Sequence, residues 1–252
     1  MLAIQVRRHS GLVAAVLLGL SGCEETVPVA DTAVPLPAPI AFSYTPGDPI
    51  TEVVLQGLER YYGGLRHVEA DTLGCPLGCQ GGDKFSYHKY GAEYARHFDP
   101  LKDKRITIVE VGVLEGTSLA VWSDIFPKGR VVGFDISLDA YNKRLPMLRE
   151  LGAFKNKNVE VHQLDSTLPA TQEAIKQLIP EKIDLFVDDG CHTTDCITAT
   201  WANVLPSMKA GGVGLLEDNV LVHQTLRFKY PGLEVVGPLA GELTVVRVPN
   251  SR

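Results

Sequence analysis

Three carboxylates and one histidine directly follow two apolar segments, where they are placed to do metal-assisted acid–base chemistry. Asp189 and His192 come after one segment, and Glu217 and Asp218 come after the next one along the chain. If the two segments are neighbouring parallel strands, about 4.8 Å apart, the carboxylates can converge at one end of a sheet. Crowded carboxylates repel one another, and a hard divalent cation neutralises them. The pattern predicts an Mg or Mn site made of Asp189, Glu217 and Asp218, with His192 beside it as a general base.

A simpler interpretation of the same residues stays open. Acidic residues at strand ends often only cap the following helix, and a single histidine is usually structural or exposed to solvent. Asp188, which precedes Asp189, is expected to shape the turn or a cofactor pocket rather than to bind the metal.

A second candidate site follows an earlier apolar segment, in the sequence from Glu110 to Ser118. Its two glycines, Gly112 and Gly116, are four positions apart. Glycine lets a backbone approach a ligand closely, and the N-terminus of a following helix offers free N–H groups. The GxGxxG spacing of dinucleotide sites is absent because residue 114 is leucine. A tight strand-to-helix turn that binds no ligand is the alternative.

Two aspartates end the next two apolar segments. Asp135 stands where an acidic side chain can accept hydrogen bonds from ribose hydroxyls, and Asp165 stands at the matching height after the following segment, within reach of an adenine amino group. An acidic ribose-binding residue also occurs in NAD-binding folds, so Asp135 alone does not identify the nucleotide.

These residues require a sheet that brings strand ends together. β-Branched apolar segments typical of buried strands alternate with helix-like segments, which predicts parallel βαβ units and an α/β, doubly wound, mostly parallel sheet. The expected strands are 106–112, 130–134, 159–163, 183–187 and 213–216, and the expected helices are 118–126, 140–151, 170–178 and 194–208. Ligands in such folds bind beyond the carboxyl ends of the strands.

Two further strand candidates, 225–229 and 243–248, lie in the C-terminal part, separated by glycines and prolines. We expect them to form an antiparallel hairpin at the edge of the sheet.

Composition narrows the functional classes. The chain has 252 residues, 45% hydrophobic and 21% charged, which is ordinary for a globular protein. Its net charge of −6 argues against a broad electrostatic grip on nucleic acid.

The first 23 residues have the features of an export signal. Arg7 and Arg8 precede the apolar run 11–20, and the run ends in Leu20-Ser21-Gly22-Cys23. This ending looks like a bacterial lipobox, which implies cleavage before Cys23, a lipid anchor on it and a membrane-anchored lipoprotein. A chance apolar stretch at the start of a cytoplasmic protein is the alternative.

Proline-rich residues 24–50 are expected to form a disordered tether, and the folded domain is expected to span residues 51–252.

The remaining cysteines are Cys75, Cys79, Cys191 and Cys196. Their spacings differ from the CxxC pairs that structural zinc sites favour, so we do not expect zinc. In an exported protein Cys75 and Cys79 could form a disulfide, whereas in a reducing compartment all four would be free. The connectivity stays open.

The acidic residue of the first strand, the two spaced glycines and the acids that end the next strands together resemble the class I S-adenosylmethionine-dependent methyltransferases. The sequence DDGxH at 188–192, the GG at 211–212 and the ED at 217–218 are similar to the macrocin-type sugar O-methyltransferases, relatives of proteins labelled cephalosporin hydroxylase. Upstream, Asp83-Lys84, His88-Lys89-Tyr90 and Tyr94 resemble a segment of that family that folds over the cofactor.

The resemblance implies a Rossmann-like methyltransferase fold with S-adenosylmethionine and Mg as cofactors. Asp189, Glu217 and Asp218 would hold the metal, and His192 would remove a proton from a hydroxyl of a sugar or similar small-molecule acceptor. The cofactor-binding residues would be Lys84, Tyr90, Glu110, Gly112, Gly116, Ser118, Asp135, Asp165 and Asp188.

Two departures from the family bear on the acceptor and on the compartment. Cys191 stands where the family usually has serine, and only residues 219–252 follow Asp218. S-adenosylmethionine is made in the cytosol, so an exported protein would lack its donor. A non-catalytic, membrane-tethered binding protein that retains the fold is therefore the alternative, and a homo-oligomer stays open.

Overall fold

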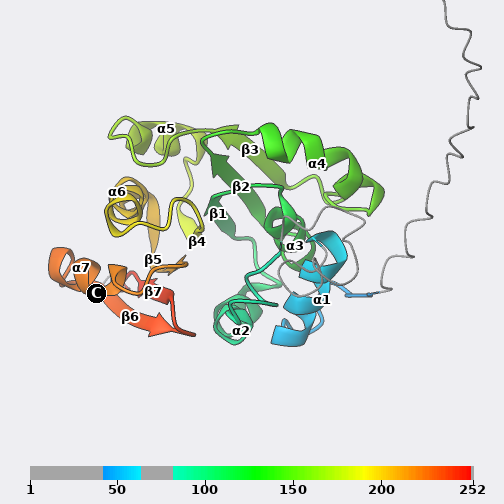
Figure 1. Cartoon of the computed structure of the whole chain (residues 1–252), viewed down its shortest axis with the longest axis horizontal. Helices are drawn as coiled ribbons and strands as arrows, with labels where there is room; N and C mark the ends of the chain where they lie inside the picture. The colour runs from blue at the N-terminus through cyan, green and yellow to red at the C-terminus, as the bar shows by residue number, and fades with distance from the viewer. Residues whose placement is uncertain (1–41, 64–81, 251–252) are drawn as a thin grey trace, which may run out of the picture. The chain divides into compact units, whose positions relative to one another are not determined.

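The fold is built around one sheet of seven strands. The computed structural model describes residues 42–63 and 82–250 of the chain. The strand order is β3-β2-β1-β4-β5-β7-β6, in which the first five strands are parallel and β7 runs antiparallel to both of its neighbours (Figure 1).

Strands β1, β2 and β4 and the second half of β5 are mostly buried, whereas the edge strand β3 is partly exposed. β1 is entirely buried, as expected for a strand covered on both faces. In register, Val111 of β1 pairs with Asp188 of β4, and Asp188 pairs with Leu216 of β5, so the carboxyl ends of these strands meet at one edge. The five strands are β1 (Thr107–Val111), β2 (Arg130–Asp135), β3 (Val159–Gln163), β4 (Ile183–Asp188) and β5 (Met208–Leu216).

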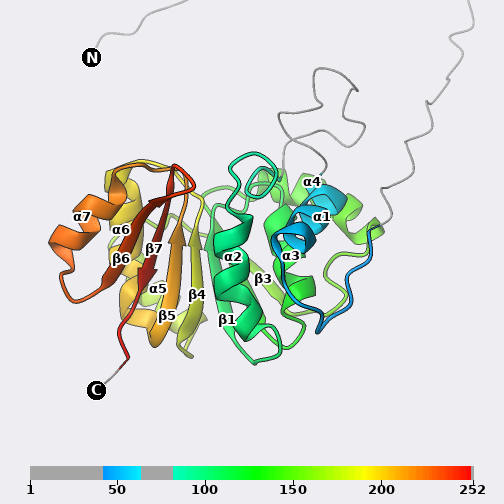
Figure 2. The same cartoon turned by 90° about the horizontal axis from the view of Figure 1, so that it is seen from below.

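Helices cover both faces of the sheet, with one hydrophobic core on each side (Figure 2). The core beneath α1 to α4 is centred on Trp122, and the core beneath α5 to α7 on Trp201; both rings are fully buried. The helices are α1 (Glu52–Gly63), α2 (Gly91–Phe98), α3 (Thr117–Ile125), α4 (Asp139–Glu150), α5 (Thr171–Leu178), α6 (Thr194–Val204) and α7 (Val222–Lys229), with 3-10 turns η1 (Asp99–Leu101) and η2 (Leu205–Ser207). The predicted doubly wound sheet is confirmed.

The order of the strands reverses between β1 and β4. From β1 the chain builds outward through β2 to β3, then returns to place β4 on the other side of β1. A crevice at the carboxyl ends is expected at such a switch point.

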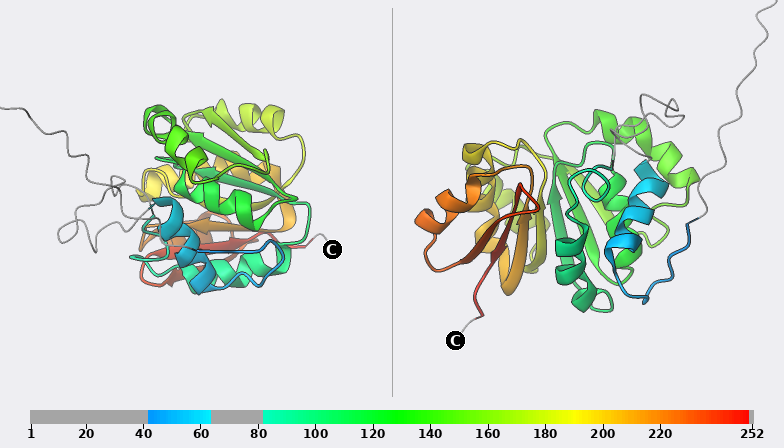
Figure 3. Two further views of the ribbon diagram at one scale, coloured as in Figure 1. Left: turned by 90° about the vertical axis from the view of Figure 1, so that its right-hand side faces the viewer. Right: turned by 60° about the horizontal axis from the view of Figure 1, so that its bottom comes forward.

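The C-terminal segment differs from the prediction in one element. Residues 225–229, expected to be a strand, belong to helix α7. Oδ1 of Asn219 accepts the backbone N–H groups of Leu221 and Val222, which satisfies donors at the start of the helix, and Val222 and Leu226, one turn apart, are both buried. The predicted hairpin does exist, but it is formed by β6 (Glu234–Leu239) and β7 (Leu243–Arg247) at the sheet edge (Figure 3).

Several predictions fall outside the described residues. The signal segment with Cys23, the tether up to residue 41, and Cys75 with Cys79 are among them. Within the described ranges, no helix combines the length and the apolar character needed to cross a membrane.

Candidate active site

A cavity of about 680 Å³ lies at the carboxyl edge of the sheet. Residues that follow each of the five parallel strands line it, together with the segment 82–85. Among the predicted site residues, the cavity lining contains Lys84, Gly112, Ser118, Asp135, Asp165, Asp189, His192 and Asp218. One cavity therefore joins the predicted cofactor half of the site to the predicted chemical half.

Gly112 brings two strand-end turns into contact. Its φ is +90°, and a Cβ atom there would lie 1.9 Å from the carbonyl oxygen of Asp189. The backbone N–H of Asp189 in turn donates to the carbonyl of Val111 at 2.9 Å. Only glycine fits this position, because both the left-handed backbone and the close approach exclude a side chain. Gly112 is therefore required to seat Asp189, whether or not a ligand is bound.

Asp135 fixes the glycine turn from the neighbouring strand. Its Oδ2 accepts the backbone N–H groups of Val113 at 2.8 Å and Leu114 at 3.0 Å. Asp165, further along the cavity, accepts hydrogen bonds from the amide and the hydroxyl of Thr167, and these bonds lower the pKa of the Asp165 carboxyl. Both carboxylates line the cavity, where their oxygens can accept hydrogen bonds from polar groups of a nucleoside.

Glu110 lies beneath the cavity, not in its lining. The side chain is fully buried, and its Oε2 accepts hydrogen bonds from Ser118 Oγ at 2.7 Å and Trp122 Nε1 at 2.9 Å. Burial raises the pKa of this carboxyl. Glu110 therefore orients the start of α3 through Ser118 and does not reach a ligand in the cavity.

The Lys84 ammonium is the counter-ion of three carboxylates. Its Nζ lies 2.5 Å from Asp189 Oδ2, 2.9 Å from Glu217 Oε2 and 3.3 Å from Glu110 Oε1, and its side chain is only 6% exposed. Burial alone would lower the pKa of Lys84, but the carboxylates outweigh it and the pKa is raised well above the ordinary value. Lys84 is therefore charged, and its ammonium is engaged by protein groups.

This arrangement departs from the prediction for Glu217. We expected Glu217 to join Asp189 and Asp218 around an ion, but its Oε2 faces Lys84 and its Oε1 accepts a hydrogen bond from Tyr94. Burial raises the pKa of Glu217 well above its usual range. The physical reason is that a carboxylate buried this deeply must be compensated, and Lys84 supplies a positive charge beside it. Metal binding by Glu217 stays a prediction.

Asp189, His192 and Asp218 do come together. The imidazole of His192 lies between the two carboxylates, with Nε2 3.9 Å from Asp189 Oδ1 and Nδ1 3.7 Å from Asp218 Oδ2. One atom from each residue lies within 4.8 Å of the others, a spacing that could hold a metal ion. The His192 side chain is 41% exposed, so a ligand in the cavity can reach it.

The backbone carrying His192 is tied down on both sides. Asn219 Nδ2 donates to the carbonyl of His192 at 2.9 Å, and a disulfide joins Cys191 to Cys196 across the same loop. His192 and Asp218 both have φ of +56°, a left-handed conformation in which His, Asp and Asn are enriched. In the structure Cys191 and Cys196 are therefore bonded to each other and are not free thiols.

Besides Glu110, three of the predicted cofactor-binding residues lie outside the cavity lining. Tyr90 is fully buried and donates its hydroxyl to Asp218 Oδ1 at 2.6 Å. Gly116 has φ of +82° and packs against Tyr141. Asp188 is buried, accepts the amide of Gly190, and has a pKa raised by burial to about 7. These residues position the site from behind; for Asp188 this agrees with the expected role in shaping the turn.

Two residues near the site had no predicted role. His88, quoted only for a family resemblance, has Nδ1 3.4 Å from Asp218 Oδ1. Glu242, in the turn between β6 and β7, has Oε2 3.5 Å from the same His88 nitrogen. No sequence signal marks Glu242, because its place depends on how the hairpin pairs with β5.

The central part of the chain is similar to known proteins. Residues 109–219 match a family described as a methyltransferase domain. The 8-demethyl-8-alpha-L-rhamnosyl tetracenomycin-C 2'-O-methyltransferase of Streptomyces olivaceus is 31% identical over 145 residues, covering 55% of this chain and 35% of that protein. The mycinamycin VI 2''-O-methyltransferase of Micromonospora griseorubida is 24% identical over 143 residues, covering 54% of this chain and 33% of that protein. The chain thus spans well under half the length of these relatives.

A solved structure shares the fold. The MycE methyltransferase from the mycinamycin biosynthetic pathway, in complex with Mg, SAH and mycinamycin VI, superposes with a TM-score of 0.52 at 18% identity. The match covers 73% of this chain and 62% of that one. The predicted resemblance to methyltransferases, and the predicted Rossmann-like fold, are confirmed.

Proposed function

We propose that this chain, whose residues 109–219 match the methyltransferase domain family, is an S-adenosylmethionine-dependent O-methyltransferase assisted by Mg and acting on a sugar hydroxyl. The observation that carries the proposal is the single cavity in which Asp135 and Asp165 lie at one end and Asp189, His192 and Asp218 at the other. The relatives' names supply the reaction class and the sugar acceptor.

The donor fits the nucleotide half of the cavity. The volume of about 680 Å³ lies in the range of cavities that bind small molecules and cofactors. Asp135 and Asp165 provide acceptors for ribose hydroxyls and an adenine amino group. The exposed apolar side chains of Leu114 and Ile136 line the same part and offer flat contact for a base. The fixed turn at Gly112 keeps these groups in place before the donor binds.

The metal fits the chemical half of the cavity. Asp189 and Asp218 supply oxygen ligands and His192 lies between them. Glu217 stays a proposed third ligand: it would join Asp189 and Asp218 in holding the ion if its Oε2 were released from Lys84. A divalent ion there supplies Lewis acidity that lowers the pKa of an acceptor hydroxyl.

The side chains of the protein then have two roles, which are to accept a proton and to position the acceptor. His192, whose imidazole lies between Asp189 and Asp218, would accept the proton of an acceptor hydroxyl held beside these carboxylates, and the donor would supply the methyl group. Asn219 and the disulfide hold the His192 loop during this step. The sulfonium donor carries its own leaving group, so the reaction requires no nucleophilic side chain.

Placement of the protein in the cell belongs to the proposal as well. Cys23 is proposed to carry a lipid anchor, and residues 24–41 are proposed to form the tether. Residues 42–50 were also predicted to belong to the tether, but they pack against the domain: Ile50 is buried in the core, and Phe42 and Tyr44 pack against it. An exported enzyme needs a supply of donor outside the cytosol, so the anchor and the activity are tested separately: palmitate labelling of the full chain against its Cys23→Ser variant reports the anchor alone.

The activity is tested by methyl transfer from labelled S-adenosylmethionine to rhamnosides and related glycosides, using the full chain with and without Mg. We expect transfer that depends on Mg and falls at least a hundredfold in His192→Asn, because general base catalysis contributes on the order of a hundredfold or more. Asparagine tolerates the left-handed backbone of residue 192, so the variant should fold. Donor binding without transfer to any glycoside would favour another acceptor; no donor binding would favour the non-catalytic binding protein.

A further inference from the structure

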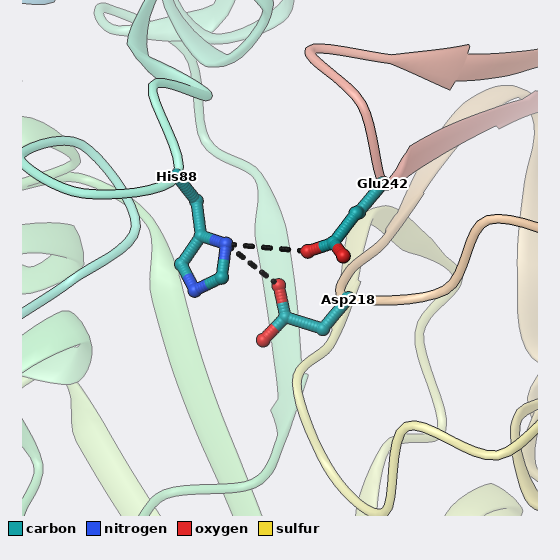
Figure 4. Close-up of side chains that lie close together, drawn as sticks. All are labelled: His88, Asp218 and Glu242. Carbon is teal, nitrogen blue, oxygen red and sulfur yellow. Dashed lines mark ion pairs between the residues drawn. The ribbon is translucent and has the colours of Figure 1, made fainter.

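A second group of potential metal ligands lies beside the candidate active site. His88 comes from the segment before α2, Asp218 from the end of β5, and Glu242 from the turn between β6 and β7 (Figure 4). Nδ1 of His88 points at both carboxylates, 3.4 Å from Asp218 Oδ1 and 3.5 Å from Glu242 Oε2. Three segments far apart in the sequence thus converge on one point.

The ligand atoms have the spacing of a metal site. Atoms bound to one ion at about 2.1 Å lie roughly 3.0–3.4 Å apart in octahedral or tetrahedral geometry. The two distances from His88 Nδ1 are close to that range, and all three ligand atoms lie within 4.8 Å of one another. Small side-chain shifts would bring them onto one ion.

Charge at this point also favours a cation. Within the described ranges, neither Asp218 nor Glu242 forms an ion pair with a lysine or arginine. Their ion-pair partners there are the imidazoles of His88 and His192. Lys84 is engaged by other carboxylates. Two carboxylates therefore meet around a histidine nitrogen without a permanent positive charge among their ion-pair partners.

Asp218 belongs to both groups through different oxygens. Its Oδ1 faces His88 and accepts the Tyr90 hydroxyl, whereas its Oδ2 faces His192. A carboxylate with one oxygen toward each of two ligand sets is the arrangement of a bridging ligand in a two-metal site. The Tyr90 hydrogen bond holds the carboxylate in this orientation.

We infer that His88, Asp218 and Glu242 form a second divalent-cation site, which shares Asp218 with the first site, where Asp189 and Asp218 are the proposed ligands beside His192. The inference goes beyond the proposed function, since methyl transfer requires only the first site. The imidazole nitrogen favours a transition-metal ion such as Mn²⁺ over Mg²⁺, which prefers an all-oxygen shell. An ion at this site would tie the 82–90 segment, part of which lines the cavity, to the β6–β7 hairpin.

The test is a count of bound Mn²⁺ on the full chain by equilibrium dialysis, with electron paramagnetic resonance to detect coupling between ions. Wild type is expected to bind two Mn²⁺ with a spin-coupled signal. The variants His88→Gln and Glu242→Gln are each expected to bind one, to lose the coupling, and to weaken the second site at least tenfold. Glu234→Gln, on exposed β6, is the matched control and should still bind two.

Circular dichroism and thermal melting establish that each variant is folded. A single wild-type ion that survives His88→Gln and is lost in Asp189→Asn would overturn the inference, as would no binding at all. A single ion that is lost in both His88→Gln and Glu242→Gln would support the site at His88. It would contradict the claim that Asp218 bridges two ions. Methyl transfer with Mg is measured separately, so failure of the second site and failure of the proposed function give different results.

Discussion

The ammonium of Lys84 lies 2.5 Å from Asp189 Oδ2, in a buried ion-pair cluster that also includes Glu217 and Glu110. The three carboxylates come from the ends of three strands, and Lys84 comes from a segment that precedes the sheet in the sequence. The lysine therefore joins the N-terminal segment to the carboxyl edge of the sheet, and its charge offsets the repulsion that would otherwise push these strand ends apart.

Replacing Lys84 by methionine should destabilise the fold. Removal of one partner of a buried ion pair leaves uncompensated charge and costs about 3–5 kcal/mol. Urea unfolding of the full chain measures this loss. The control is Lys209→Met, whose ion pair with Asp184 is largely exposed and should contribute less than about 1 kcal/mol. Equal, small losses in both variants would contradict the role given to Lys84.

The same variant should bind Mg more tightly. The ammonium and a divalent ion compete for Asp189 and Glu217, so loss of the ammonium removes a repelling charge from the site. We expect at least a tenfold gain in Mg affinity by calorimetry, equivalent to about 1.4 kcal/mol, and partial recovery of stability when Mg is added. Weaker Mg binding in Lys84→Met would mean that the lysine supports the metal site instead of competing with it.

Asp188 should make stability depend on pH. Burial raises its pKa to about 7 from the ordinary 3.8, so the folded protein holds this proton more tightly than the unfolded chain does. The contribution of Asp188 to the free energy of unfolding is fully present at pH values below the pKa of Asp188 in the unfolded chain. It is lost as the pH rises toward the folded-state pKa of about 7. Asp188→Asn removes the titration and should gain about 2–3 kcal/mol relative to wild type between pH 5 and pH 8. Denaturant melts of both proteins at the two pH values provide the measurement, and parallel stability curves would refute the assignment.

Gly112→Ala should be among the most damaging small substitutions. The new Cβ would collide with the Asp189 carbonyl, and φ of +90° disfavours any side chain. A loss of at least about 2 kcal/mol is expected from overpacking and backbone strain together. Gly232→Ala is the control, because nothing lies within 4 Å of a Cβ at that position. Thermal melting of both variants measures the loss of stability. Equal melting temperatures would contradict the close approach of residue 112 to the Asp189 carbonyl.

The disulfide between Cys191 and Cys196 should stabilise the loop that carries His192. Closing so short a loop is worth about 2 kcal/mol in the chain-entropy account. The Cys191→Ser/Cys196→Ser double variant should therefore unfold at lower urea concentration than oxidised wild type, and a thiol reductant should shift wild type toward the variant. If reductant leaves the wild-type midpoint unchanged, the loop is held by other contacts such as Asn219.

The sequence predicted the elements that local patterns determine. The β-branched run around residues 107–111 predicted a buried strand correctly, and the acidic or glycine residues that follow the strands marked the edge where the cavity lies. The apolar positions of residues 225–229 suit either a strand or a short helix. The hydrogen bonds from the backbone N–H groups of Leu221 and Val222 to Asn219 favour the helix. The local pattern of apolar residues alone does not distinguish a strand from a helix here.

The partners of the charged side chains were less accessible to sequence reasoning. Lys84 is 105 residues from Asp189 along the chain, and Tyr94 is 123 residues from Glu217. Such pairs depend on how the segment before the sheet packs across the strand ends, which no local spacing encodes. For the same reason Glu242 could not be placed next to His88.

Calorimetric titration of S-adenosylmethionine into the full chain is the most direct test of the donor site. Saturable binding to one site per chain is expected, weakened at least tenfold in Asp135→Asn, which retains one acceptor oxygen for the turn, and unchanged in Glu173→Gln on the exposed face of α5. If the wild-type chain gives no heat of binding at concentrations that saturate known methyltransferases, the cavity is not a donor site and the proposed activity is wrong.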